Sequence, residues 1–545
     1  MAAPTNDAPK GWLYGPAPDL LLGCGVLFMV LSAVFAVGGD SLFGSIPYVI
    51  PAVLIALISA PHYGATLLRV YDQREDRQGY FLFSVVATLA LLAVAGVAMF
   101  NPLVGSILAT VYLTWSVWHY TAQNYGISMM FLRRRGAPLD AGIQRLFHAS
   151  FNLSFALVFV IMHGASDSVA DPAREVRMMP LSIPDGASEV ILPLLMVAYG
   201  VATLGWLVQL GRRVERFQDL APPILISLLQ ALWWSVPYLD KQFGFAGGTV
   251  AGDWDARMRF FPWVACAHAA QYIWITSFYA RASDRWQGNT RYYIKILLAG
   301  SAIWALPALL FAPGTGEFDW NFMLLLAATV NLHHFILDGA IWKLRQLKIA
   351  NVLIRSRESV ETSAPESPGL RKLVWAIAAI GFVATVHDLT ERFVIEPAAI
   401  ERQDWASLAG SLDRQQWHGK GSAFDRFKLA RRLERSGDPA AAALQFEISA
   451  AMEPRVESIK RLIARYYATN DREGFVRNCD RLFELPHIER PLPTISLGAA
   501  SRPEFIEFRD ACVTVAEAAR PLPPDQSDGA GGTGQGGLVP SRADY

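Results

Sequence analysis

The chain has 545 residues, of which 52% are hydrophobic and only 18% are charged, and its formal net charge is zero. This composition excludes an ordinary soluble protein. The net charge itself says nothing about nucleic acid, and no nucleic-acid partner is expected. Several segments approach the roughly 20 apolar residues that a helix needs to cross a bilayer. The composition therefore predicts a multi-pass protein of the cell membrane, such as a bacterial inner membrane.

About eleven helical spans are predicted, which makes the fold class all-α, with a membrane helix bundle at residues 18–388. Residues 1–17 form a polar tail that does not resemble a cleaved signal peptide, so the first hydrophobic segment should remain as an anchor. The predicted spans are 18–38, 46–68, 80–100, 103–130, 147–163, 188–210, 220–239, 258–280, 292–312, 319–342 and 371–388.

Lysine and arginine cluster after every second predicted span, while the intervening loops are neutral or acidic. Cytoplasmic loops of membrane proteins carry the excess of Lys and Arg, so the tail 1–17 is predicted to be cytoplasmic and the residues after 388 extracytoplasmic. The basic clusters are Arg69 to Arg77, Arg133 to Arg135, Arg212 to Arg216, Arg281 to Arg285 and Lys343 to Arg357.

Four of the inward-running spans carry histidine, at His62, at His119, at His268 and at the pair His333 and His334. Each histidine precedes its basic cluster by about 7–14 residues, so at about 1.5 Å per residue all of them lie within about 10 Å of one depth. Neutral imidazole is a common ligand of iron, copper and zinc, and helix bundles build metal sites from several helices. The set predicts a metal site, whereas any single histidine would more often be a hydrogen-bonded structural residue.

Polar residues near these histidines are candidates to orient the imidazole rings or to take part in chemistry. Gln123 follows His119 by one helical turn, Tyr272 follows His268, and Asp338 follows His334. Asn124 and Gln271 lie beside them in sequence, and any of the five could bond a free ring nitrogen. Gln123, Tyr272 and Asp338 are the predicted catalytic residues.

The segments SAPHYGATLLR, WHYTAQNYG, ACAHAAQYIWITSFY and NLHHFILDGAIWKLR resemble, in the same order, the four histidine motifs of the bacterial Brp/Blh membrane proteins, β-carotene dioxygenases that split carotene to retinal. The resemblance implies a ferrous ion, Fe(2+), bound by one histidine from each motif. In the last motif the family has its histidine five residues before an aspartate, which selects His333 over His334. The implied ligands are therefore His62, His119, His268 and His333. His334, which shares a helix face with Asp338, stays a candidate metal ligand as well.

Three positions depart from the family pattern. Thr66 and Leu67 stand where the family has an aspartate after the first histidine, and Asn124 stands in place of the aspartate that follows the second. Tyr272 replaces a second histidine in the third motif. Because of these departures, the resemblance implies the metal site more strongly than it implies the carotenoid substrate.

The function predicted from these motifs is that of an iron-dependent membrane oxygenase acting on a lipophilic substrate, carotenoid-like or lipid, that enters from the bilayer. Two alternatives remain open at this stage. One is a membrane transferase for polyprenyl-linked sugars or acyl groups, and the other is an electron carrier with haem between paired histidines. Absorption and metal content of the purified protein distinguish the three.

Beyond the spans, residues 389–520 are charged and amphipathic and predict a soluble helical domain, while the Gly-, Pro- and Ser-rich tail 521–545 predicts disorder. One window fits a tetratricopeptide repeat and a degenerate second unit follows, so we expect a protein partner here. The four cysteines have no metal-type spacing, and no chemistry is assigned to them. The repeat positions are Ala430, Leu433, Gly437, Ala442, Phe446 and Pro454, then Ala464, Tyr467 and Asp471, and the cysteines are Cys24, Cys266, Cys479 and Cys512.

Overall fold

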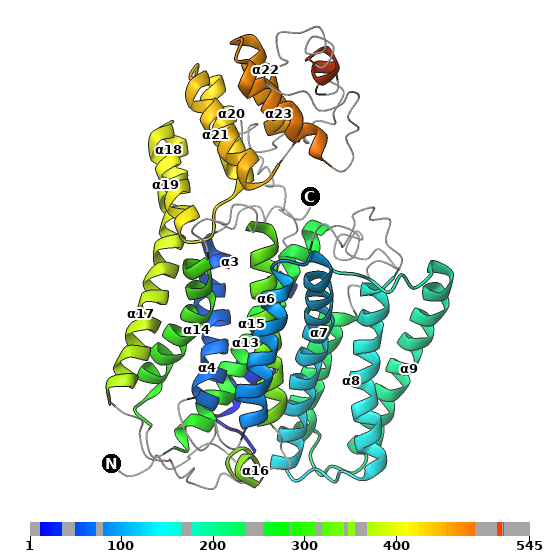
Figure 1. Ribbon diagram of the computed structural model, residues 1–545. Helices are drawn as coiled ribbons and strands as arrows, with labels where there is room; N and C mark the ends of the chain where they lie inside the picture. The colour runs from blue at the N-terminus through cyan, green and yellow to red at the C-terminus, as the bar shows by residue number, and fades with distance from the viewer. Residues whose placement is uncertain are drawn as a thin grey trace. The chain divides into compact units, whose positions relative to one another are not determined.

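Helices make up the regular structure of the chain (Figure 1). Over the described residues there is no β-strand and only one isolated bridge, between Gly164 and Ile183, so the predicted all-α class is confirmed there. The predicted disordered tail 521–545 lies outside the described residues. The computed structural model describes residues 11–34, 49–71, 80–164, 176–235, 254–283, 286–311, 319–342, 347–354, 368–454, 456–485, 509–514 and 516.

The chain divides into two compact units. The first comprises Met1–Trp304, Asn321–Val383 and Ser541–Tyr545, and the second comprises Ala305–Trp320 and Ala384–Pro540. In the first unit the helices α4 (Ala60–Tyr71), α7 (Pro102–Arg134), α13 (Trp254–Arg281) and α15 (Asp319–Ile341) carry the candidate site. The other elements up to residue 390 are α1 (Pro16–Pro18), η1 (Asp19–Gly23), α3 (Val49–Leu54), η2 (Ile55–Ser59), η3 (Leu82–Ala87), α6 (Thr88–Ala98), α8 (Ala141–Met162), α9 (Asp185–Gly211), η4 (Phe217–Leu220), α10 (Ala221–Trp234), α14 (Asn289–Phe311), α16 (Leu347–Leu353) and α17 (Pro368–Thr390).

Six helices among the described residues are long and apolar enough to cross a membrane, and a bent pair, Pro16–Gly23 and Val26–Val34, would make a seventh. The bend between the two members of this pair is 59°. These helices fit the predicted class of multi-pass membrane protein. The six are Ala52–Tyr71, Ala141–Met162, Asp185–Gly211, Asn289–Leu310, Phe322–Ile341 and Lys372–Glu401.

Helix α9 shows why this bundle belongs in lipid. Its inner face buries Ala202, Trp206 and Leu210, of which Trp206 contacts Phe147 of α8 edge to face. Its outer face exposes a column of branched aliphatic side chains. In water such a continuous apolar face would be unfavourable, whereas hydrocarbon chains of a bilayer cover it at no cost. The exposed residues are Val190, Leu194, Val197, Val201 and Leu204.

Helices α4 and α14 approach each other closely through two glycines. A Cβ atom at Gly64 would overlap the backbone carbonyl of Ile296, and one at Gly300 would overlap the carbonyl of Ala60. Only glycine allows two helix backbones to lie this near. Because Gly64 is two residues from His62, this contact fixes the height and rotation of the first histidine helix.

The second unit continues after α17 with a π-helical turn, η5, and then a series of short helices. Its core is formed by apolar side chains of these consecutive helices, including four positions of the repeat pattern, Ala430, Leu433, Ala442 and Phe446, which are all buried. The tetratricopeptide identification itself stays a prediction. The elements are η5 (Glu391–Ile395), α18 (Glu396–Glu401), α19 (Trp405–Trp417), α20 (Ala423–Arg435), α21 (Pro439–Met452), α22 (Val456–Ala468) and α23 (Arg472–Glu484).

Glu447 connects the last three of these helices. Its carboxylate accepts hydrogen bonds from Tyr466 on α22 and from Arg481 and Asn478 on α23. Partial burial would raise the pKa of Glu447, but the hydrogen bonds, chiefly from Arg481, hold it below its usual value. The ionised carboxylate therefore joins α21, α22 and α23 at neutral pH.

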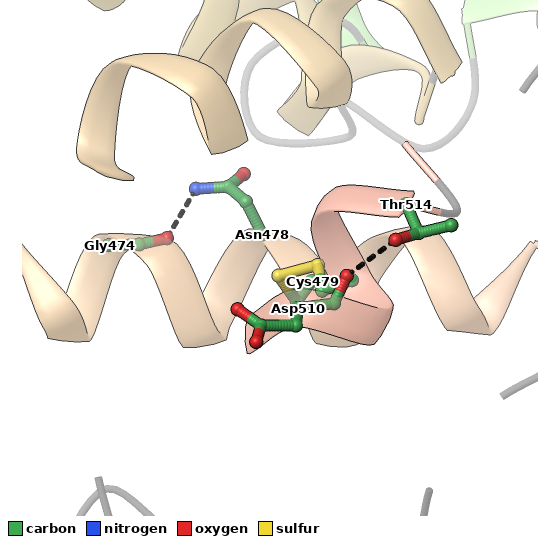
Figure 2. The surroundings of a disulfide bond; sticks show 6 residues. Gly474, Asn478, Cys479, Asp510 and Thr514 are labelled. Atoms are coloured by element: carbon green, nitrogen blue, oxygen red, sulfur yellow. Dashed lines mark hydrogen bonds between the residues drawn. A yellow bond between two sulfur atoms is a disulfide. The ribbon is translucent and has the colours of Figure 1, made fainter. Parts of the chain in front are cut away.

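The last helix of this series is joined by a disulfide to a segment of chain much further on. Cys479 on α23 is bonded to Cys512, 33 residues away, which lies in the short helical segment 509–514 (Figure 2). The prediction that the four cysteines carry no chemistry is therefore wrong for Cys479 and Cys512, which form a disulfide. Cys24 and Cys266 are free and buried, as expected of cysteines that act as small apolar residues.

Candidate metal centre

Four helices of the first unit bring one histidine each to a single buried point. His62 comes from α4, His119 from α7, His268 from α13 and His334 from α15, and one ring nitrogen of each lies within 4.8 Å of the others. The rings meet edge to face in a closed circuit. Their centroid distances are 4.2 Å for His62 and His334, 5.0 Å for His334 and His119, 4.9 Å for His119 and His268, and 5.0 Å for His268 and His62.

The structure therefore assembles the predicted four-helix set, with one correction. His334, not His333, belongs to it. Neighbouring residues of a helix point about 100° apart, so only one of the two can face the centre. The ring of His333 lies instead against Tyr71, whose hydroxyl is 3.1 Å from His333 Nε2. The five-residue spacing to Asp338 taken from the family selected the wrong neighbour.

The ring nitrogens that converge are buried and have no hydrogen-bond partner among the described residues. Nε2 of His62, of His119 and of His334 has no partner, and neither does either nitrogen of His268, which contributes one of them to the group. Buried polar atoms are nearly always hydrogen-bonded, and leaving one unpaired costs about 1–3 kcal/mol. Several such atoms at one point indicate that something else satisfies them, and a metal ion does so through their lone pairs.

The donor set fits such an ion. Two nitrogens 4.8 Å apart would each lie about 2.4 Å from a point midway between them, slightly more than the usual metal–nitrogen bond of about 2.0–2.1 Å. Small side-chain rotations that move each nitrogen by a few tenths of an ångström would close that difference. Imidazole donors suit zinc, copper, iron and nickel, so the four histidines could bind any of these ions.

His62 follows the π-helical turn η2, and a backbone carbonyl of this turn orients its ring. In this turn the carbonyl of Leu57 accepts the Tyr293 hydroxyl at 2.5 Å. The Ser59 carbonyl lies 3.3 Å from His62 Nδ1. A carbonyl can only accept, so Nδ1 carries the proton and the lone pair of Nε2 is left for the centre.

Beside the histidines lies a second buried group formed by Thr66, Tyr272 and Asp338. The Tyr272 hydroxyl donates to Asp338 Oδ1 at 2.6 Å, and the Thr66 hydroxyl donates to the same oxygen at 3.1 Å. His334 Nδ1 lies 2.8 Å from Thr66 Oγ1. Since the Thr66 proton goes to Asp338, His334 Nδ1 is the donor in this contact, and its Nε2 lone pair faces the centre. Trp342 completes the group by donating to the Tyr272 hydroxyl at 3.0 Å.

The expected partners of the imidazoles are only partly found. Tyr272 and Asp338 lie at the centre, but the Gln123 amide donates to the backbone carbonyl of His268 and to Gln271, each at 3.1 Å. Gln271 donates in turn to the Gly23 carbonyl and to Asn124. The expectation that Gln123, Asn124 and Gln271 bond ring nitrogens is therefore not met in the described contacts. These amides join α7 to α13 and to the N-terminal segment.

Thr66 is the residue that the sequence pattern missed. It was noted only as the replacement of an aspartate, yet it touches His334, Tyr272 and Asp338. Its spacing was informative, because Thr66 follows His62 by four residues, as Tyr272 follows His268 and Asp338 follows His334. Residues four apart share a helix face, so all three project to the same side of the histidines.

Aromatic rings cover the other sides of two imidazoles. His119 stacks on Phe335 at a centroid distance of 4.4 Å, and His268 stacks on Tyr120 at 4.1 Å. Such contacts limit ring rotation and keep water from the nitrogens.

Comparison with known proteins gives no match to a family model, to a curated protein or to a solved structure. The resemblance to the Brp/Blh proteins therefore depends on the four histidine motifs alone.

Proposed function

We propose that this protein is an integral-membrane, iron-dependent oxygenase that acts on a lipophilic substrate, carotenoid-like or lipid. The observation that carries the proposal is the convergence, in an apolar helix bundle, of four buried imidazoles that each have a ring nitrogen without a hydrogen-bond partner among the described residues. Four neutral ligands leave the full charge on a bound ion and leave one or two positions open. Bound iron would supply the activation of dioxygen, which protein side chains cannot perform.

The chain's own residues would hold, orient and shield the reaction centre. Ser59 and Thr66 fix the tautomers of His62 and His334, so that both present Nε2 to the ion. Phe335 and Tyr120 cover the imidazoles and exclude water from reactive species. A substrate dissolved in the bilayer would reach such a site from the side, without crossing the aqueous phase.

The two alternative functions are less well supported. A haem brings four pyrrole nitrogens of its own around the iron, so four protein nitrogens directed at one point favour a bare ion over haem. A transferase would need acidic or histidine side chains near the outer face. The main acids in the loops expected outside are Asp240, Asp253, Asp255 and Asp319, and the structure describes the side chain of none of them. No contact among the described residues favours this reading.

We further infer that α7 and α13 are membrane spans, which brings the count towards the predicted eleven. They contain 33 and 28 residues, about 50 Å and 42 Å of helix, more than the roughly 30 Å of a hydrocarbon core. Their mean hydropathy is lowered by the very residues that build the centre, including His119 and His268. Polar residues inside a bundle are typical of functional membrane helices.

The second unit, in this proposal, is extracytoplasmic and binds a protein partner through helical repeats. The alternation of Lys and Arg supports the location, and the Cys479–Cys512 disulfide supports it independently, because such bonds persist outside the reducing cytoplasm. Paired amphipathic helices present a continuous surface that is suited to a peptide or protein.

Single His→Ala variants of the detergent-purified protein test the metal site. We expect His62→Ala, His119→Ala, His268→Ala and His334→Ala each to purify without stoichiometric iron, because each removes one of four ligands. His333→Ala is the matched control, since it lies on the same helix beside His334, and it should keep the wild-type iron content. Iron would be measured by elemental analysis, and folding by size-exclusion chromatography and circular dichroism.

Two results would contradict the proposal. One is wild-type protein that neither contains nor takes up iron, and the other is a folded His268→Ala variant with full iron occupancy. A Soret band in the purified protein would support the haem carrier instead.

A further inference from the structure

The carboxylate of Asp338 reaches the edge of the histidine cluster. Its Oδ2 atom lies 3.3 Å from His334 Nε2 and 3.8 Å from His119 Nε2. Asp338 is buried, with 7% of its surface exposed, so water does not screen these contacts. Neither nitrogen forms a hydrogen bond with the carboxylate, because both remain without a partner of acceptable geometry.

The two carboxylate oxygens have different surroundings. Oδ1 accepts the hydroxyls of Tyr272 and Thr66, which hold this oxygen in place. The opposite oxygen, Oδ2, is thereby turned towards the imidazole nitrogens. A buried carboxylate held at one oxygen and directed at lone pairs by the other is unfavourable unless a positive charge lies between them.

Two separations of the carboxylate are close to those of donors that share one ion. Two ligand atoms bound at about 2.1 Å lie about 3.0 Å apart at a right angle and about 3.4 Å apart at the tetrahedral angle. Oδ2 and His334 Nε2 are within this range, and His119 Nε2 is within a few tenths of an ångström of it. A direct ion pair with a protonated histidine would instead show a hydrogen bond to one of the nitrogens.

We propose that Asp338 is a fifth ligand of the ion held by His62, His119, His268 and His334, with Oδ2 as the donor atom and Tyr272 and Thr66 as the residues that position it. This inference rests on the proposed function, since it needs the four-histidine centre. A carboxylate reduces the net charge of a divalent centre from two to one and fills a fifth position. One position of an octahedral ion then remains, and a five-donor set disfavours zinc, which prefers four ligands.

Cobalt(II) is the probe, because its visible absorption is strong in four-coordinate sites and weak in five- or six-coordinate ones. The apo protein in detergent would be titrated with Co(II) as wild type, as Asp338→Asn and as His333→Ala, the control. We expect weak bands for wild type and His333→Ala. Asp338→Asn should give intense, red-shifted bands and an affinity at least about 10–100-fold lower, the loss usual even for groups that only support a ligand.

The outcomes separate the two proposals. If wild type binds Co(II) and Asp338→Asn has the same spectrum and affinity, the fifth ligand is wrong while the histidine site stands. If wild type binds no Co(II), both are wrong. X-ray absorption of the wild-type Co(II) protein counts the ligands without any variant, so it decides the matter even if Asp338→Asn does not fold. A coordination number of four would overturn the inference.

Discussion

At the scale of single residues, the centre depends on donors and acceptors placed one helical turn from the ligands. Thr66 connects the histidine cluster to the carboxylate of Asp338. It accepts a hydrogen bond from His334 Nδ1 and donates one to Asp338, so a single hydroxyl sets the tautomer of one group and the position of the other. A side chain of the same shape without the hydroxyl would leave His334 Nδ1 and the Asp338 carboxylate without these hydrogen bonds.

We therefore predict that Thr66→Val lowers metal affinity by about 10–100-fold, the usual cost of losing a group that supports a ligand. Valine keeps the shape and burial of threonine, so the fold should persist. Thr66→Ser keeps the hydroxyl and should retain affinity near the wild-type value. Competition against a chelator of known affinity measures the difference. Equal affinities for the Val and Ser variants would show that the Thr66 contacts do not support the ligands.

At the scale of elements, the placement of α4 is the most constrained feature of the bundle. The Ser59 carbonyl of the π-helical turn η2 orients the ring of His62, and the glycine contact with α14 sets the distance between the two helices. π-Helical turns are rare and occur frequently at functional sites. A substitution at the glycine contact should therefore change the affinity of the site for metal.

Gly64→Ala tests this coupling. The new Cβ would overlap the Ile296 carbonyl, so α4 must move away from α14, at a cost of about 1–3 kcal/mol in stability. We expect a lower thermal midpoint and weaker metal binding. Gly126→Ala on α7 is the control, because a Cβ there meets no atom within 4 Å and alanine favours the helix. Were Gly64→Ala to bind metal like the control, the close helix contact would have no part in placing His62.

At the scale of the whole molecule, two independent features concern the side of the membrane on which the second unit lies. One is the alternation of basic clusters along the chain, and the other is the disulfide of Cys479 and Cys512. Both agree with an extracytoplasmic second unit. The same alternation is what gave the four histidine helices a common direction and depth.

Reporter fusions test this topology. A fusion at Glu358 is expected to be active with a cytoplasmic reporter, and one at Asp425 with a reporter that works only outside the cytoplasm. In intact protein, Cys479 and Cys512 should react with a thiol reagent only after reduction and denaturation, whereas Cys24 and Cys266 should react after denaturation alone. An active cytoplasmic reporter at Asp425 would overturn the orientation and the depth argument with it.

Features that depend on neighbouring residues were predictable from the sequence. Hydropathy and length identify helices that cross a membrane, because each such helix must satisfy its own backbone in lipid. The positions of His62, His119 and His268 relative to the basic clusters placed them at one depth, and the structure brings them together. Spacing of four residues likewise marked Tyr272 and Asp338 as companions of the ligands.

Features that depend on how a helix is rotated, or on which distant segments meet, were decided only by the tertiary structure. The choice of His334 over His333 needs the rotation of α15, which is set by packing on all its sides. The same applies to Thr66, whose partners lie 206 to 272 residues further along the chain, and to Gln123, which bonds a backbone carbonyl rather than an imidazole. The disulfide joins cysteines 33 residues apart whose spacing carries no signal. Sequence periodicity gives the face of a helix, but only packing determines what that face meets.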